Sequence, residues 1–269
     1  MREIKVRTSQ RPRPLPSGRW ALTQRWNDLL LAHWRVPASC VAALLPQGLL
    51  VDTFQGSAWL GVVPFWVDQL KFRGVPSVLG IRSFPELNLR TYVRDQQTGS
   101  PGLYSFSVDA GSLLAVAAMR LIFNLPYRWA EMRFSQRAER EFAFYSRRRL
   151  SGSPVMFKAR YRGLGPTRRL AEMRSGSLEY FLTERHCLFI RNGAGQMVRT
   201  NIHMVSSPME DAEAEIDHND LASAIGIHLP PQDPVFYYSR RLAVYVWPTE
   251  LVRPLRVPRR APAMVAPSG

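Results

Sequence analysis

The sequence predicts an α+β fold built on a closed, mainly antiparallel β-sheet with a few helices. One segment, residues 84–94, alternates apolar and polar residues with the period of a β-strand. Further strand-like segments follow along the chain, separated by turns that contain Gly, Asn or Asp. The hydrophobic content of 46% in 269 residues is ample for a packed core. Sequential antiparallel strands with few helices favour a sheet that closes on itself.

The segment 84–94 has one apolar and one polar face. The apolar face consists of Leu87, Leu89, Thr91 and Val93, and the polar face of Glu86, Asn88, Arg90, Tyr92 and Arg94. Two interpretations are open: a solvated face, as antiparallel sheets often have, or a face that looks into a concave site. Because a strand rises about 3.3 Å per residue, Glu86 and Arg90 lie roughly 13 Å apart along it. Each of these charged residues therefore needs a partner from elsewhere.

The first third of the chain is expected to contain two helices and a hairpin. Apolar residues recur at helical spacing over residues 24–34, which predicts an amphipathic helix that ends before Pro37. His33 on this stripe is interpreted as a core histidine with a satisfied ring nitrogen. A short helix over residues 39–45, capped by Ser39, is followed by a hairpin of strands 49–54 and 57–67 with a turn at Gln55-Gly56. A loop over residues 68–83 leads to the segment 84–94.

The remainder of the chain is predicted to be a series of strands with short helices. Residues 103–108 are expected to pair with 84–94, and Asp109 to cap a buried helix over 112–123. Strands at 127–137, 141–149 and 155–161 precede a solvated basic loop, which carries Arg160, Arg162, Arg168, Arg169 and Arg174. A helix over 177–184 leads to a hairpin of strands 186–191 and 196–205. A helix over 217–224, ended by Gly226, and a strand over 235–247 complete the prediction.

The net charge of +15 is concentrated at the two ends of the chain. Residues 1–19 carry five net positive charges and residues 253–269 carry four, which leaves six for the residues between them. Both ends are rich in proline and lack hydrophobic periodicity, so we interpret them as disordered basic arms around a single domain of residues 20–252. No nucleic-acid-binding motif accompanies the arms, which argues against nucleic acid as a specific partner.

The cysteines and the hydropathy pattern predict a cytoplasmic protein. Cys40 and Cys187 lack metal-binding spacing, so we expect two thiols rather than a disulfide. No secretory signal is visible, and the most apolar run, residues 113–123, is too short for a bilayer, which takes about 20 residues. Dinucleotide, P-loop, zinc-protease and hydrolase motifs are absent, and the five histidines show no helical pair. The sequence therefore predicts neither a metal nor a cofactor.

Several segments, taken in order, resemble one protein family. They are Ala32-His33-Trp34-Arg35-Val36-Pro37, Leu44-Leu45-Pro46, residues 52–65, Phe84-Pro85-Glu86-Leu87-Asn88-Leu89-Arg90-Thr91-Tyr92-Val93, Leu125-Pro126-Tyr127 and Leu182-Thr183-Glu184-Arg185. Over roughly residues 20–250 the chain resembles the uncharacterised bacterial DUF2071 (YqjF-like) family. That family is similar to the acetoacetate decarboxylase-like superfamily, so the resemblance implies a cone-shaped antiparallel β-barrel with flanking helices and an internal pocket. A fold by itself does not assign an activity.

The resemblance argues against imine chemistry. Acetoacetate decarboxylases carry a Pro-Lys-Lys motif, in which the first lysine forms a Schiff base and the second lowers its pKa. The similar place here reads Pro126-Tyr127-Arg128. Neither tyrosine nor arginine supplies the neutral amine that a Schiff base needs, so imine-type decarboxylation is not expected. Lys71 and Lys158 remain as candidates for a relocated nucleophile, although a surface lysine is the simpler interpretation of each.

Three functional hypotheses follow. In the favoured one, the pocket binds a small carboxylate or carbonyl compound. Its site residues would be Glu86 as the catalytic hydrogen-bond acceptor or general base, and Asn88, Arg90, Tyr92, Tyr127 and Arg128 as ligand-binding residues. In the second, the same groups form a buried Glu/Arg network that stabilises a non-catalytic scaffold. In the third, the basic arms contact a polyanion in a salt-sensitive manner.

Overall fold

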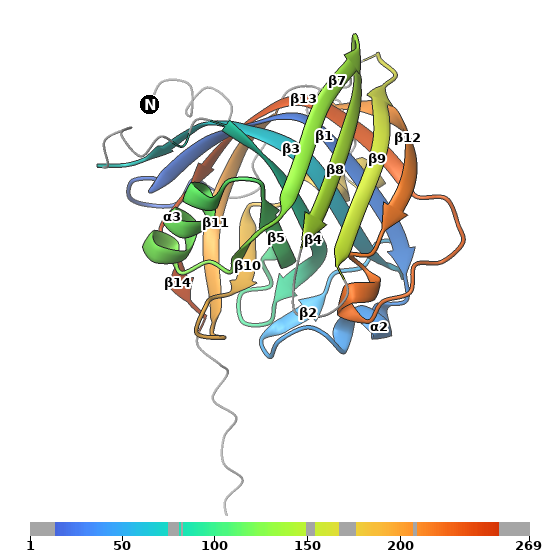
Figure 1. Cartoon of the computed structure of the whole chain (residues 1–269). Helices are drawn as coiled ribbons and strands as arrows, with labels where there is room; N and C mark the ends of the chain where they lie inside the picture. Colours follow the sequence, from blue (N-terminus) through green and yellow to red (C-terminus); the bar gives the residue numbers. More distant parts are fainter. Residues whose placement is uncertain are drawn as a thin grey trace, which may run out of the picture.

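The computed structural model describes residues 14–74, 81, 83–148, 154–166, 176–206 and 209–252 (Figure 1). Within this part of the chain the protein is mostly β-sheet with few helices. Most of the predicted basic arms, residues 1–13 and 253–269, and the predicted loop residues Arg168, Arg169 and Arg174 lie outside the described residues. No helix in the described residues combines the length and the apolar character needed to cross a membrane.

Seven strands form a ring of backbone pairings. β11 pairs with β10 on one side and with β13 on the other, so the path through the sheet returns to its starting strand. All of these pairings are antiparallel except β10 with β5, which is parallel. In ring order the strands are β11 (Met197–Ser206), β10 (Cys187–Arg191), β5 (Pro101–Ala110), β4 (Ser83–Asp95), β3 (Ala58–Phe72), β1 (Leu22–Val36) and β13 (Val235–Val246).

An outer sheet covers one side of this ring. It continues from β13 and runs through β12 (Met209–Asn219), β9 (Val155–Gly163), β8 (Glu141–Arg148) and β7 (Glu131–Ala138). Figure 1 shows these four strands lying across β1, β3 and β4. Leu87 and Leu89 of β4 share one buried cluster with Phe142, Phe144 and Phe157 of the outer sheet. Apolar burial between the two layers therefore accounts for the apolar face of β4.

Short elements complete the fold. The helices are α2 (Ala38–Ala42), α3 (Leu113–Phe123), α4 (Leu178–Thr183) and the 3-10 turn Ser223–Ile225. Three short strands pair at the margins: β2 (Leu49–Val51) with β4, β6 (Tyr127–Trp129) in parallel with β5, and β14 (Glu250–Leu251) with β11. Cys40 is exposed on α2 and Cys187 is buried on β10, so no disulfide joins them, as predicted.

Many predicted elements are confirmed. The segment 84–94 is β4, and it pairs with β5 as expected. The strands β8, β9 and β13, the helix α4 and the β10–β11 hairpin also occur at or near their predicted positions. The predicted strand 127–137 is divided into β6 and β7 at Ala130.

The predicted helix over residues 24–34 is wrong, because these residues belong to strand β1. Residues 29–34 are buried on both faces, between the ring interior and the outer sheet. A strand packed on two faces has an almost continuous apolar sequence, and such a run also satisfies helical spacing. His33 is buried as expected, with Nε2 2.6 Å from the Tyr92 hydroxyl.

The predicted helix over residues 217–224 is wrong in its first half, since residues 217–219 belong to β12; its second half overlaps the 3-10 helix Ser223–Ile225, which ends at Gly226 as predicted. Charged residues replace the apolar alternation that would have indicated this strand. Glu213 and Glu215 instead form ion pairs with Arg162 and Arg160 of β9, at 2.7 and 2.8 Å. These two arginines therefore lie on a strand and not in a loop.

Three local predictions need correction. Asp109 does not cap α3; it lies on β5, and Ser112 Oγ accepts the hydrogen bond from the Ala115 amide. Ser39 does not cap α2, whose first flanking residue is Pro37. The turn at residues 54–57 exists as a single bridge, but β2 pairs with β4 rather than with β3.

Candidate functional site

The polar face of β4 contributes to a cavity inside the ring. Glu86, Asn88 and Arg90 are all buried, so the interpretation of this face as solvated is wrong. The three residues line a cavity of about 60 Å³. Its other polar lining residues are Gln24, Ser105, Tyr127, Thr200 and Thr249, and most of the remaining wall is aliphatic or aromatic. A small, largely apolar space with a few polar groups is typical of a small-molecule site.

Glu86 is protonated at neutral pH. Only 1% of its surface is exposed, and burial, assisted by the nearby Asp109 charge, raises its pKa to about 8. Hydrogen bonds from Asn88 and Tyr127 act against this rise. Glu86 Oε2 and Asn88 Oδ1 are buried without a hydrogen-bond partner among the described residues. The cavity therefore holds a neutral carboxyl group with unused hydrogen-bonding capacity.

Arg90 is a buried cation without a carboxylate partner. Its exposed fraction is 6%, and within the described residues no carboxylate lies at ion-pair distance from it. Its Nε is buried and makes no hydrogen bond. The neighbouring His33 stays neutral, because burial first and the Arg90 charge second lower its pKa to about 3. Burying a charge is costly unless it is paired, so the position of Arg90 carries an electrostatic cost that no carboxylate among the described residues offsets.

Tyr92 does not line the cavity. Its hydroxyl lies between His33 Nε2, at 2.6 Å, and the Leu182 carbonyl oxygen, at 3.2 Å. The Arg185 guanidinium lies 5.1 Å from its ring centre, and Arg185 forms a buried ion pair with Asp52 at 2.5 Å. Tyr92 is thus part of the packing that joins β4 to β1 and α4.

The structure separates Tyr127 from Arg128. Both lie on β6, but Tyr127 lines the cavity and hydrogen-bonds to Glu86, whereas Arg128 is half-buried outside it. Arg128 lies near the buried Asp109–Arg148 ion pair of 2.8 Å; burial and the Arg148 charge lower the pKa of Arg128. Glu86 and Tyr127 therefore converge on one cavity, and Arg128 does not.

Neither described lysine lines the cavity. Lys71 is exposed near the end of β3, and Lys158 is exposed on β9 with its Nζ 2.9 Å from Asp217. Both are surface lysines, which was the simpler of the two interpretations. Within the described ranges, no three His, Cys, Asp or Glu side chains gather in a way that could hold a metal ion.

The sequence prediction missed the residues that other strands contribute to the cavity. Gln24 enters it from β1, Ser105 from β5 and Thr200 from β11. Gln24 was hidden by the wrong helix prediction. The spacing of Leu22, Gln24 and Trp26 was the available signal, because a strand period places all three on one face, and the structure shows that face to be buried.

Comparison with known proteins identifies the family. A model of the DUF2071 family of uncharacterized conserved proteins matches residues 23–243. The chain is also 39% identical over 244 residues to the uncharacterized protein YqjF of Bacillus subtilis (strain 168), covering 90% of this chain and 97% of YqjF. The chain belongs to the DUF2071 family. This DUF2071 protein matches its relative over nearly the whole length of both chains.

Solved structures with a similar fold include decarboxylase-like enzymes. The enduracididine biosynthesis enzyme MppR superimposes with a TM-score of 0.63 at 12% identity, covering 87% of this chain and 90% of MppR. An acetoacetate decarboxylase-like enzyme from Sphingomonas wittichii RW1 has a TM-score of 0.57 at 14% identity, covering 90% and 99% of the two chains. Acetoacetate decarboxylase from Legionella pneumophila has a TM-score of 0.58 at 12% identity, covering 93% and 95%. At these identities the likeness establishes a shared fold only.

Proposed function

We propose that this DUF2071 protein binds a small carboxylate or carbonyl compound in the ring cavity, with Arg90 as the anion-binding group and Glu86 as a proton donor. The ring would have the cone-shaped barrel form that the superfamily resemblance implies. The observation that carries the proposal is the buried guanidinium of Arg90, which has no carboxylate partner among the described residues, in the same cavity as a neutral Glu86.

Arg90 supplies the attraction for an anion. A carboxylate placed against its guanidinium would receive charge-assisted hydrogen bonds and neutralise the buried charge. No carboxylate competes for that place among the described residues: His33 is neutral, and Arg90 has only a hydrogen bond with the hydroxyl of Tyr92, which also contacts His33 and Leu182. The cavity volume of about 60 Å³ limits the ligand to a few non-hydrogen atoms, well below the roughly 300 Å³ at which drug-sized sites begin.

Glu86 supplies a proton at the other end of the polar face. A carboxyl group whose pKa is about 8 is mostly protonated at pH 7, so it donates a hydrogen bond to a carbonyl oxygen. Asn88 and Tyr127 hold this carboxyl through their hydrogen bonds. This is the reverse of the sequence-based expectation, in which Glu86 was a hydrogen-bond acceptor or a base.

The fold neighbours support this ligand class. Solved structures of MppR contain pyruvate in one case and a condensation product of pyruvate and imidazole 4-carboxaldehyde in another. Pyruvate is a small keto acid: its carboxylate is the kind of group that Arg90 suits, and its carbonyl oxygen is the kind of group that Glu86 suits. A lysine-dependent imine route is not part of the proposal, because neither described lysine lines the cavity.

The test is a thermal-shift panel of pyruvate, acetoacetate, butyrate and butyraldehyde on the wild type, Arg90→Met and Arg128→Ala. A ligand at a hundred times its dissociation constant stabilises a fold by about 2.7 kcal/mol, which is readily measured. We expect at least one keto acid to raise the melting temperature of the wild type and of Arg128→Ala, the matched control outside the cavity. Arg90→Met should abolish this shift and should itself raise the melting temperature of the ligand-free protein, because it removes an unpaired buried charge.

Two results would contradict the proposal. One is a ligand-induced shift that survives Arg90→Met, which would place the ligand elsewhere. The other is an absence of any shift in the wild type together with destabilisation by Arg90→Met. That pair of results would favour the alternative in which Glu86, Asn88 and Tyr127 form a purely structural network.

A further inference from the structure

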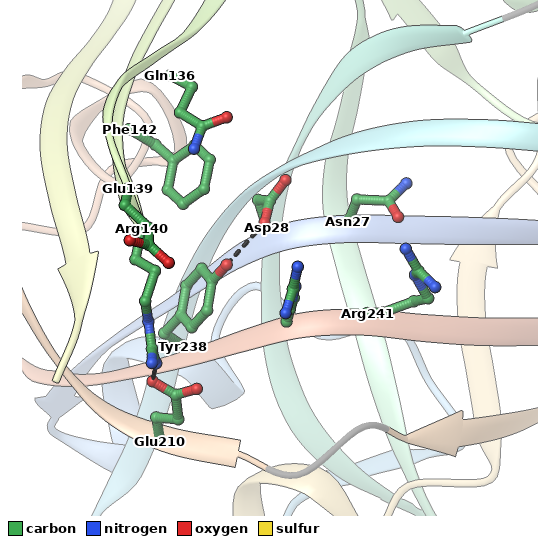
Figure 2. A pocket seen from close by; sticks show the side chains of 10 residues that line it. Asn27, Asp28, Gln136, Glu139, Arg140, Phe142, Glu210, Tyr238 and Arg241 are labelled. Carbon is green, nitrogen blue, oxygen red and sulfur yellow. Dashed lines mark hydrogen bonds and ion pairs between the residues drawn. The ribbon is translucent and has the colours of Figure 1, made fainter. Parts of the chain in front are cut away.

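A second, larger cavity lies between the ring and the outer sheet. It has a volume of about 520 Å³ and shares no lining residue with the ring cavity. The first group of its lining residues, Gln136, Glu139, Arg140 and Phe142, comes from the β7–β8 hairpin. The second group comes from β1, β12 and β13 and consists of Asn27, Asp28, Glu210, Tyr238, Arg240 and Arg241 (Figure 2). Its volume falls in the range of about 300–1,000 Å³ that is typical of small-molecule sites.

The wall of this cavity holds Asp28 in a strained conformation. Asp28 has a φ of 52° within β1, the left-handed region that residues other than glycine rarely adopt. Two tyrosines fix it there: the Tyr238 hydroxyl donates to Asp28 Oδ1 and the Tyr161 hydroxyl to its carbonyl oxygen, both at 2.6 Å. Arg140, in the β7–β8 turn, also has a positive φ of 66°. Such strain gathers at binding sites, where the surrounding structure over-determines the geometry.

The three arginines of this cavity differ in their partners. Arg140 forms an ion pair with the buried carboxylate of Glu210, which also accepts a hydrogen bond from the Gly165 amide at 3.1 Å. Arg240 and Arg241 have no carboxylate at ion-pair distance within the part of the chain that the structure describes. Their charges act on Asp28, whose carboxylate is already engaged by Tyr238.

We propose that this cavity is a second ligand site, which binds a small hydroxylated organic anion through Arg240 and Arg241. Arg240 and Arg241 both line the cavity and have no carboxylate at ion-pair distance among the described residues, so their guanidinium groups are suited to a carboxylate or a phosphate group. Glu139 and Asp28 present acceptors for the hydroxyl groups of such a ligand. The rings of Phe142 and Tyr238, stacked at 5.9 Å between centres, form a flat wall beside them. Figure 2 shows Asp28, Glu139 and Tyr238 around the same space, with Arg241 at the β13 side.

The test is calorimetric titration of the full-length protein with malate, succinate, 3-phosphoglycerate and inorganic phosphate at physiological ionic strength. The neutral compound glycerol serves as the ligand control. We expect malate or 3-phosphoglycerate to bind, and the double variant Arg240→Ala/Arg241→Ala to weaken that binding by about tenfold or more. Arg137→Ala is the matched control, because Arg137 is exposed on the same hairpin but does not line the cavity.

The hydroxyl preference is tested separately. Malate differs from succinate only by one hydroxyl group, so the wild type should bind malate more tightly, and Glu139→Ala should reduce that preference. Equal binding to the wild type and to the double arginine variant would overturn the proposal, as would an equal loss in Arg137→Ala. A failure of all four anions to bind the wild type at millimolar concentration would also overturn it. Arg90→Met separates the two sites, because it changes a lining residue of the ring cavity and none of the second cavity. Binding to the second cavity should therefore be unchanged in Arg90→Met.

Discussion

Arg90 and Glu86 show how one strand can hold a charge and a proton at the same site. The two side chains lie four residues apart on β4, and both reach the ring cavity. Glu86 avoids the cost of a buried negative charge by keeping its proton, as its pKa of about 8 indicates. Arginine cannot lose its proton at neutral pH, so Arg90 carries a cost that an anionic ligand would relieve. Without its proposed ligand, the folded protein is therefore less stable than it would be with an apolar residue in place of Arg90.

The raised pKa of Glu86 predicts a specific pH dependence of stability. In the unfolded chain this carboxyl ionises near its ordinary pKa of 4.5, whereas in the folded protein it keeps its proton up to about pH 8. The folded state therefore binds more protons between these values, and stability falls as the pH rises through this window. Glu86→Gln cannot ionise, so we expect it to become the more stable variant by up to roughly 5 kcal/mol at pH 9. Denaturant unfolding of both proteins from pH 5 to pH 9 checks this.

The control for this experiment is the variant Glu139→Gln. Glu139 is an exposed glutamate on the β7–β8 hairpin, so its substitution removes a carboxyl group that is not buried. His33, whose folded pKa of about 3 is below its ordinary 6.5, contributes the opposite trend: stability present above pH 6.5 is lost as the pH falls. That contribution is the same in the wild type and in Glu86→Gln, so it cancels in their difference. If the free energy of unfolding changed equally with pH in the wild type and in Glu86→Gln, Glu86 would be ionised in the folded protein.

The strands show which elements could be predicted from sequence. The alternation of residues 84–94 predicted β4, because its two faces differ in polarity although both are buried. The same logic failed for β1, whose two buried faces are both apolar around residues 29–34. It failed for β12 because charged residues replace the apolar face there, and these charges form ion pairs with those of β9 on the neighbouring strand. Cross-strand partners are not visible in a single sequence, and neither was the parallel β5–β6 pairing that brings Tyr127 to Glu86.

The Asp109–Arg148 pair joins the ring to the outer sheet, and its loss is expected to be costly. Asp109 lies on β5 and Arg148 on β8, and both side chains are almost fully buried. Asp109→Ala would leave Arg148 charged and unpaired, so we expect a loss of about 3–5 kcal/mol in the free energy of unfolding. The double variant Asp109→Ala/Arg148→Met should recover most of that loss. A double-mutant cycle measured by urea unfolding checks this, and an additive double variant would refute a direct coupling of the two residues.

At the scale of the whole molecule, one strand serves two layers. β13 pairs with β1 and β11 in the ring and with β12 in the outer sheet. Its residues Val244 and Val246 line the ring cavity, and Tyr238, Arg240 and Arg241 line the second cavity. The ring cavity is small, whereas the larger second cavity is formed where the outer sheet leaves the ring. Two ligand sites of different size can therefore coexist in one fold without sharing a side chain.

The ring of pairings predicts an order of amide hydrogen exchange. β13 residues 242–246 pair with β1 on one side and with β11 residues 202–206 on the other, so the ring has no free edge at these β13 residues. Among the described strands, β7 is the edge strand of the outer sheet, and most of its residues are exposed. Unpaired edges open locally at low free energy, whereas strands paired on both sides open only with larger units. We expect the amides of β13 residues 242–246 that hydrogen-bond to β11 to exchange at least about a hundredfold more slowly than those of β7. Hydrogen exchange resolved by NMR checks this, with the β3–β4 pairing as the internal reference for a continuous sheet. Exchange of these β13 amides at the rate of β7 would mean that the ring is open between β11 and β13.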